Sequence, residues 1–228
     1  KLGRSIDMFA TLREKSWLNS PSATASGGFN SEISRKTVAL RFFLAVISVL
    51  FSLFIVTFLA RSQFPDFQAL AGQAWQPFTN PQQLWVNTGI LLAASVAIQF
   101  ASSSAKNNRL LAANIAIALC GLFTLAFIGA QILVWQHLID LGYFVASNPA
   151  NSYFYLFTAI HGLHLVGGIF VLLRLGLRST AQTQNSLIIS TSLCANYWHY
   201  LLLVWVLLFA LLTSTPDTYK TLAALCGF

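Results

Sequence analysis

Five long apolar segments constrain this chain more than any other feature. A helix needs about 20 predominantly apolar residues to cross the hydrocarbon core of a bilayer, and five windows of the sequence meet this requirement. They run from Phe42 to Ala60, Leu84 to Ala101, Leu110 to Leu138, Ser152 to Leu173 and Leu187 to Leu212. With 56% hydrophobic and 8% charged residues, the composition is typical of a polytopic membrane protein. The sequence therefore predicts an all-α fold, a bundle of five transmembrane helices.

The basic residues predict which way the bundle faces. Of the 13 Lys and Arg residues, eleven fall on the side of the N-terminus and two on the other side. Because basic residues are enriched in cytoplasmic loops, we expect a cytoplasmic N-terminus and an exoplasmic, periplasmic C-terminus. The eleven are Lys1, Arg4, Arg13, Lys15, Arg35, Lys36, Arg41, Lys106, Arg109, Arg174 and Arg178, and the two are Arg61 and Lys220. The net charge of +7 thus indicates topology and contact with anionic lipid headgroups, and no nucleic-acid binding.

This topology divides the chain into three parts. Residues 1–36 are predicted to be a polar cytoplasmic N-terminal arm, which lacks the apolar core of a signal peptide. Residues 37–214 are predicted to form the five-helix transmembrane bundle, and residues 215–228 a short exoplasmic tail. The chain begins with Lys1 rather than Met, so we expect further residues in front of it.

No carboxylate is expected in the middle of the bilayer. The acids are Asp7, Glu14, Glu32, Asp66, Asp140 and Asp217, which all lie outside the predicted spans or at their edges. Proton pumps and ion-coupled transporters commonly depend on buried acids. A transporter or pump acting through this chain alone is therefore disfavoured.

Two histidines lie in the middle of the fourth predicted span, where polar groups need a partner. His161 and His164 share one face of the fourth predicted helix, and Gly168 continues the stripe, so this face is expected to meet a closely packed helix. A second stripe on the fifth predicted helix is expected to face the first. It contains Ser192, Asn196 and His199.

Histidines inside a membrane span can ligate haem, bind a metal ion or form structural hydrogen bonds. His164 and His199 lie at similar depths, which is compatible with axial haem ligation, but b-type cytochromes usually carry several such histidines with glycines that make room for the haem. Copper or zinc would have His161, His164 and His199 without an acid or a nearby thiolate to complete the shell. We therefore expect structural, metal-free histidines that hydrogen-bond between the last two helices or to a neighbouring carbonyl. No catalytic, cofactor-binding or metal-binding residue is expected.

Three segments of the predicted spans match known sequence motifs. Residues 148–168, NPANSYFYLFTAIHGLHLVGG, resemble the FxxTGxHGxHxxxG segment of subunit III of the haem-copper oxidases, and residues 197–205, YWHYLLLVW, look like the YWHFVDVVW segment of that family. Residues 84–101, LWVNTGILLAASVAIQFA, are similar to the LWLNTxxLLxSSxxxQxA helix of the five-span bacterial form. The three segments occur in the family's order and lie within residues 38–213. The motif residues, expected to be structural, are His161, Gly162, His164, Gly168, Trp198, His199 and Trp205.

The resemblance implies a non-catalytic subunit of a respiratory haem-copper terminal oxidase, a cytochrome c oxidase, in the bacterial cytoplasmic membrane. It implies that haem and copper are held by subunits I and II, with subunit I as the main contact, subunit II and small subunits as further partners, and phospholipid bound to the bundle. The implied role is to support assembly, lipid binding and sustained proton uptake by subunit I. A quinol oxidase or a nitric oxide reductase assembly is the alternative, because another subunit selects the electron donor. An independent b-type cytochrome is a third reading.

Two positions depart from the family pattern. Ile47 stands where the FLxSExxxF segment has its acid, and Leu202 stands where the HFVDVVW segment has its Asp. Roles that those acids play elsewhere are therefore not expected here. The chain also lacks the two additional N-terminal helices of seven-span relatives, so the lipid cleft of those relatives is expected to be incomplete or closed by another subunit.

Overall fold

The computed structural model describes residues 25–71, 81–178 and 184–227. It divides into two compact units, residues 1–41 and residues 42–228. The described part of the first unit is helical and includes residues 25–36 of the predicted arm.

Six helices are described, and the described residues contain no strand. Five of them are long and apolar enough to cross a membrane, the first over Arg35–Arg61. The predicted all-α fold with five membrane-spanning helices is therefore confirmed. The helices are α2 (Ala25–Arg61), α3 (Gln82–Lys106), α4 (Leu110–Asp140), α5 (Pro149–Arg178), α6 (Gln184–Leu212) and α7 (Pro216–Leu225).

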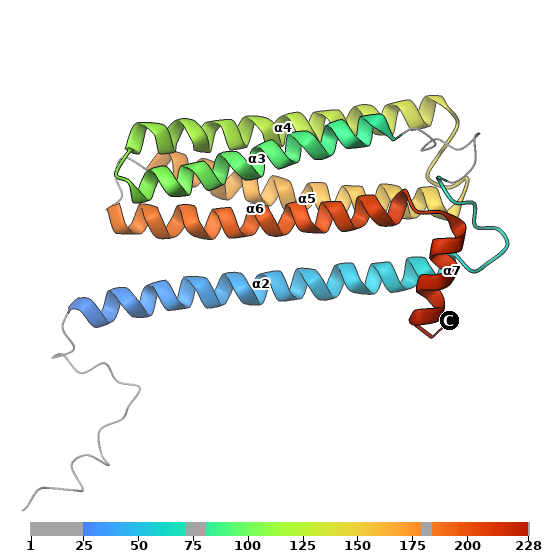
Figure 1. The fold of residues 1–228 in the computed structure, drawn as a ribbon, viewed down its shortest axis with the longest axis horizontal. Helices are drawn as coiled ribbons and strands as arrows, with labels where there is room; N and C mark the ends of the chain where they lie inside the picture. The colour runs from blue at the N-terminus through green and yellow to red at the C-terminus, as the bar shows by residue number, and fades with distance from the viewer. Residues whose placement is uncertain (1–24, 72–80, 179–183, 228) are drawn as a thin grey trace, which may run out of the picture. The chain divides into compact units, whose positions relative to one another are not determined.

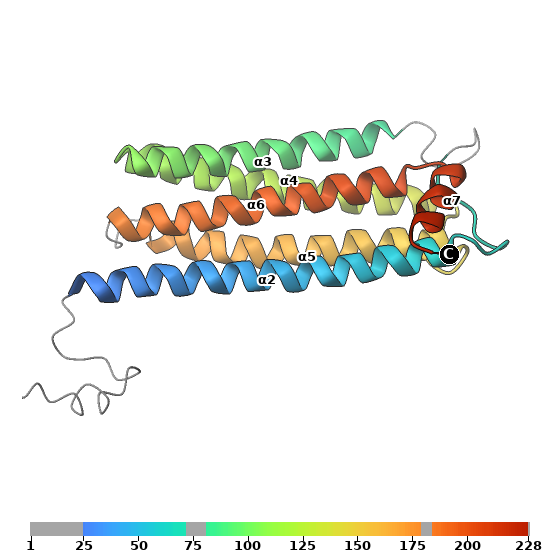
Figure 2. The same cartoon turned by 60° about the horizontal axis from the view of Figure 1, so that its bottom comes forward.

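Helices α3, α4, α5 and α6 form a closed group, in which α3 packs against α4 and α6, and α5 packs against the same two helices. Figures 1 and 2 show these four helices running alongside one another. From Phe42 onward, α2 lies alongside the group (Figures 1 and 2). Its contacts with α5 and α6 include the ring of Phe51 against His164 and a hydrogen bond between the hydroxyls of Ser48 and Tyr200 at 2.8 Å.

The basic residues of the second unit lie at its two ends, because consecutive helices run in opposite directions and their connections alternate between the ends (Figure 1). Lys106 ends α3 and Arg109 precedes α4, while Arg174 and Arg178 lie in the last turns of α5. These four belong to the same end of the antiparallel helices. The opposite end carries Arg61 and Lys220.

Helix α7 packs across this opposite end. Tyr219 is buried, and its ring lies 5.2 Å from that of Phe58 in α2 and 6.1 Å from that of Phe67 in the loop after α2. Its hydroxyl donates to the carbonyl oxygen of Leu211 at 3.0 Å. The apolar burial raises the pKa of the Tyr219 phenol. Aromatic packing and one hydrogen bond thus hold α7 against the ends of α2 and α6.

Candidate functional site: the histidine and tryptophan core

The centre of the bundle is built from the motif residues of α5 and α6. Trp198, Trp205 and His161 are almost completely buried, at 1%, 2% and 0% exposure. Trp198 and Trp205 face the interior because α6 turns its apolar stripe toward the other helices of the group, and His161 reaches the same interior from α5. The spacing of seven between Trp198 and Trp205 places both indoles on the same side of α6.

His161 is held between aromatic rings. Its ring centroid lies 5.9 Å from that of Phe127 in α4 and 5.2 Å from that of Trp205 in α6. Neither ring nitrogen has a hydrogen-bond partner among the described residues. The expectation that His161 forms a hydrogen bond is therefore wrong. Since an unpaired polar group in an apolar interior costs free energy, ring packing is what holds this side chain.

His164 forms the expected hydrogen bond with a neighbouring carbonyl. Its Nδ1 donates to the carbonyl oxygen of Ile160, one turn earlier in α5, at 2.8 Å. The ring lies against Phe51 of α2, with centroids 5.7 Å apart. In addition, the backbone carbonyl of His164 accepts a hydrogen bond from the hydroxyl of Tyr197 at 2.9 Å. Position 164 therefore connects α5 to both α2 and α6.

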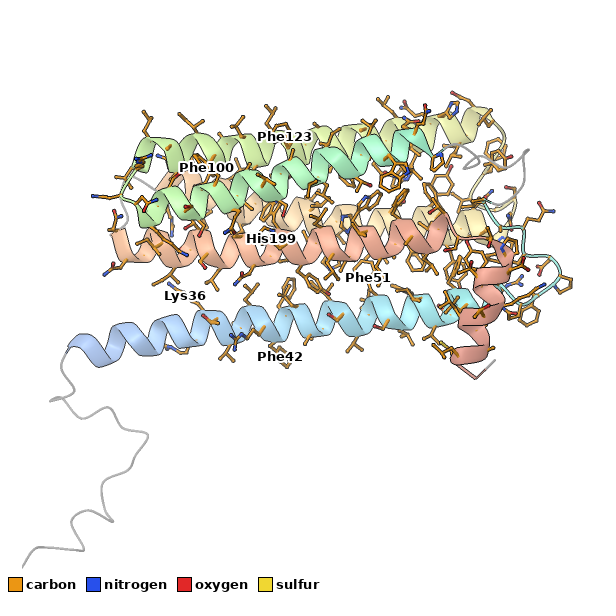
Figure 3. The ribbon with its side chains drawn as sticks, in the orientation of Figure 1. Lys36, Phe42, Phe51, Phe100, Phe123 and His199 are labelled. Carbon is orange, nitrogen blue, oxygen red and sulfur yellow. The ribbon has the colours of Figure 1, made fainter. Side chains whose placement is uncertain are left out.

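His199 faces α3 and does not face the histidines of α5. Its Nδ1 is hydrogen-bonded to Ser95 Oγ, and its Nε2 lies 3.1 Å from Gln99 Oε1. The expectation that this stripe of α6 faces the α5 histidines is therefore wrong. The cause is the neighbouring Trp198, whose buried indole sets the rotation of α6 and turns residue 199 toward α3. Figure 3 shows His199 on α6 and Phe51 on α2.

The three histidines consequently point to three different neighbours. His161 packs against α4 and α6, His164 against α2, and His199 against α3. Among the residues that the structure describes, no group of three His, Cys, Asp or Glu side chains is arranged to hold a metal ion. His164 and His199 do not face a common space, so their placement does not match a pair of axial haem ligands.

Three indoles donate to three threonines across helix interfaces. Trp198 Nε1 donates to Thr124 Oγ1 at 3.2 Å, Trp205 Nε1 to Thr88 Oγ1 at 3.0 Å, and Trp135 Nε1 to Thr158 Oγ1 at 3.1 Å. Each threonine hydroxyl in turn donates to the carbonyl four residues earlier in its own helix, at 2.7 to 2.8 Å. The hydroxyl therefore has its oxygen free to accept the indole N–H. These pairs join α4 to α6, α3 to α6 and α4 to α5.

Sequence reasoning missed the threonine partners. Thr124 lies in its span without any motif around it, and Thr158 lies in the motif segment of residues 148–168, but only the contact with a tryptophan on another helix reveals the role of either residue. A usable signal is the occurrence of Trp and Thr at matching depths, because a buried indole N–H needs an acceptor. Asn87 and Gln131 form a similar cross-helix pair, with Nδ2 of Asn87 3.0 Å from Oε1 of Gln131.

Gly168 permits the close approach that its position predicts. A Cβ at residue 168 would lie 2.9 Å from Cε1 of Tyr197 and 3.0 Å from Cη2 of Trp198, whereas real Cβ atoms essentially never come closer than 3.0 Å to such atoms. Gly162 differs, because a Cβ there would have nothing within 4 Å in the described residues. The structure therefore explains the glycine at 168 by packing and offers no packing reason for the glycine at 162.

The two positions that depart from the family pattern lie in apolar surroundings. Ile47 is buried at 3% exposure, and Leu202 is partly buried against the same core cluster. Among the described residues, Arg61 at the end of α2 forms an ion pair with Asp66 in the following loop. That guanidinium donates through both of its terminal nitrogens to the carboxylate and holds the pKa of Asp66 below its usual range.

The chain is similar to a family of respiratory proteins. A family model for cytochrome c oxidase subunit III matches residues 10–214, which leaves α7 outside the match. A probable cytochrome c oxidase subunit 3 of Mycobacterium leprae (strain TN) is 32% identical over 168 residues, 70% of this chain and 77% of that protein.

More distant relatives widen the comparison. A cytochrome c oxidase subunit 3 of Thermostichus vulcanus is 28% identical over 149 residues, 61% of this chain and 71% of that protein. A cytochrome bo(3) ubiquinol oxidase subunit 3 of Buchnera aphidicola is 29% identical over 127 residues, 55% of this chain and 65% of that protein.

Proposed function

Because the chain belongs to the cytochrome c oxidase subunit III family, we propose that it is the non-catalytic subunit III of a respiratory oxidase and acts on the durability and assembly of the complex. The observation that carries this proposal is how its interior polar groups are used. The indoles of Trp198, Trp205 and Trp135 are engaged by threonines. Such groups fix helix positions and supply no reacting atom.

Cytochrome c is the proposed electron donor of the complex. The relative from Mycobacterium leprae is named for cytochrome c oxidase and matches 70% of this chain. The relative named for a ubiquinol oxidase matches 55% of it, and this supports a quinol oxidase as the second candidate. Since the donor is selected by another subunit, the test is to purify the complex and compare its oxidation of reduced cytochrome c with its oxidation of a quinol.

Subunit I is the proposed main partner, with subunit II and small subunits as further partners and phospholipid bound to the helices. A groove of about 300 Å³ between α2 and α5 supports the lipid proposal, because its walls are apolar and it opens to the outside of the bundle. An acyl chain fits such a surface better than a polar solute does. The groove is lined by Leu53, Phe54, Thr57, Ser152, Tyr153 and Leu156.

The proposed location is the bacterial cytoplasmic membrane, with residues 1–36 as a cytoplasmic arm, residues 37–214 as the spanning bundle and residues 215–228 as a periplasmic tail. The distribution of basic residues supports this orientation. Cys226 is exposed, whereas Cys120 and Cys194 are buried, so an impermeant thiol reagent reports on the C-terminal end. Labelling of Cys226 from the periplasmic side is expected. Labelling only from the cytoplasmic side would contradict the proposed orientation and indicate the opposite one.

Removal of the chain tests the function. An oxidase prepared without it should keep its haem spectra and most of its initial turnover, while its activity should fall progressively during continued turnover. Adding back the purified chain with phospholipid should slow this loss. Altered haem spectra together with no initial activity would contradict a non-catalytic role and indicate a direct part in the redox site.

A further inference from the structure

Amide and imidazole side chains reach the outer surface of the bundle at mid-membrane depth on one face. In the described residues, these are Gln99 on α3 and Asn196 and His199 on α6, all of them exposed. His199 lies near the middle of α6 (Gln184–Leu212). Exposed groups of this polarity are costly when they face lipid hydrocarbon, and they usually face protein or a water-filled cavity.

The hydrogen bonds of His199 show which of these groups remain available. Gln99 Oε1 can only accept, so Nε2 of His199 carries the proton, and Nδ1 accepts from the hydroxyl of Ser95. Both ring nitrogens are therefore engaged within the chain. The Nε2 amide group of Gln99 has no partner among the described residues, and neither half of the Asn196 amide does. These two amides can still donate outward.

The outer faces of α4 and α5 differ from this face. At the same depth they expose only apolar side chains, which suit direct contact with lipid. On α6, the stripe that contains Asn196 continues toward the C-terminal end of the helix with exposed apolar residues, so the polar group adjoins an apolar surface. Polar contacts set within an apolar stripe are typical of helix interfaces in membranes. The lipid-facing residues include Leu119, Leu122, Leu125, Leu163, Val166 and Phe170, and the apolar flank on α6 includes Leu203 and Val206.

We propose that this face, defined by Gln99, Asn196, His199 and Leu203, docks a transmembrane helix of a neighbouring subunit of the oxidase complex. That helix presents a hydrogen-bond acceptor, a hydroxyl, amide or carboxyl oxygen, at the depth of Asn196. The proposal rests on the proposed function, because membership of the subunit III family is what supplies a neighbouring membrane subunit. An acceptor is expected because this chain presents amide N–H donors on the face, and lipid tails cannot accept hydrogen bonds from them.

Photo-crosslinking in the intact complex tests the location of the interface. A benzophenone amino acid is placed at position 196 in one variant and at position 125, on the lipid-facing side of α4, in the control. Irradiation at 196 should join the chain to a membrane helix of another subunit, identified by peptide mass spectrometry, whereas irradiation at 125 should give lipid adducts. Lipid adducts or a homodimer at 196, in a complex that still copurifies with the haem-bearing subunits, would overturn the proposed face and leave the proposed function intact.

Replacement of the amide tests the hydrogen bond itself. Asn196→Leu should weaken retention of the chain by the complex during detergent washing by about 3- to 30-fold, the range expected for one hydrogen bond between membrane helices. Asn196→Gln keeps the amide and should restore much of the retention, and Leu125→Ala should leave it unchanged. Equal retention of the Leu and Gln variants would count against a donor role for Asn196. A chain that never copurifies with haem-bearing subunits, wild type included, would instead contradict the proposed function.

Discussion

Gly168 on α5 and Tyr197 on α6 approach each other so closely that a Cβ at residue 168 would lie 2.9 Å from Cε1 of the tyrosine. The tyrosine hydroxyl meanwhile donates to the carbonyl of His164, one turn earlier on α5. A small residue and a hydrogen bond on adjacent turns therefore set the distance between the two helices.

Gly168→Ala should destabilise the bundle by about 1–3 kcal/mol, because the added methyl group overpacks a contact with two rigid aromatic rings. Thermal unfolding of the purified complex in detergent measures the loss. Gly167→Ala is the matched control, since a Cβ there would have nothing within 4 Å in the described residues. Equal effects at 167 and 168 would show that helix propensity, and not the close approach, determines the result.

Thr124→Val should cost about 1–3 kcal/mol, since it removes the acceptor of the Trp198 indole while nearly preserving volume and leaves a buried donor unpaired. Thr221→Val is the control, because Thr221 is exposed and its hydroxyl donates to the carbonyl of Asp217 in its own helix. A double-mutant cycle with Trp198→Phe measures the coupling. Strict additivity of the two substitutions would mean that the hydrogen bond contributes nothing.

His164→Leu should loosen the contact between α5 and α2 by about 1–2 kcal/mol, because it removes the ring that packs on Phe51. The half-life of oxidase activity during turnover should shorten, by less than it does when the whole chain is removed. Leu163→Ala, on the exposed side of α5, should leave the half-life unchanged. An unchanged half-life in His164→Leu would show that the contact between α5 and α2 does not contribute to the durability of the oxidase.

Tyr219→Ala should release α7, whereas Tyr219→Phe should weaken it by only about 0.5–1.5 kcal/mol, the contribution of a single hydrogen bond. Faster hydrogen exchange of the α7 amides reports both changes, and Lys220→Ala, at an exposed position, is the control. Burial raises the pKa of Tyr219 above the ordinary tyrosine pKa of about 10. The stabilisation that Tyr219 contributes is therefore fully present below about pH 10 and declines as the pH rises from there toward the raised pKa. Tyr219→Phe should therefore lose this alkaline dependence.

Acid should loosen the loop after α2 through Asp66. Its pKa is lowered by the hydrogen-bonded guanidinium of Arg61, so the stabilisation is present above the ordinary aspartate pKa and is lost as pH falls through the lowered value. The hydrogen-exchange protection factors of residues 62–71, which correct for the intrinsic pH dependence of amide exchange, should fall at low pH in the wild type. In Asp66→Asn, these protection factors should already be lower at neutral pH and should be nearly independent of pH. The effect is small, since the ion pair is exposed.

The predicted spans match the observed helices because the signal is local. Leu110 to Leu138 falls within α4, and Leu187 to Leu212 within α6, since an unbroken apolar run has no alternative to a helix in a bilayer. Gly168 was also predictable, because a small residue on a polar stripe indicates a close neighbour. Helix α7 was not predicted, since ten residues without a long apolar run resemble a polar tail.

The sequence by itself determined the class of the protein, its five spans and the side on which the basic residues gather, because these depend on composition and on distance along the chain. Only the tertiary structure decided which residues meet. The rotation of α6 depends on how the buried indoles of Trp198 and Trp205 pack against other helices. That rotation turns His199 toward Ser95 and Gln99, leaves His161 among aromatic rings, and exposes Asn196. The physical reason is that a close-packed interior leaves large indole rings few positions, so their packing fixes the rotation of the helix and thereby the direction of the smaller polar side chains.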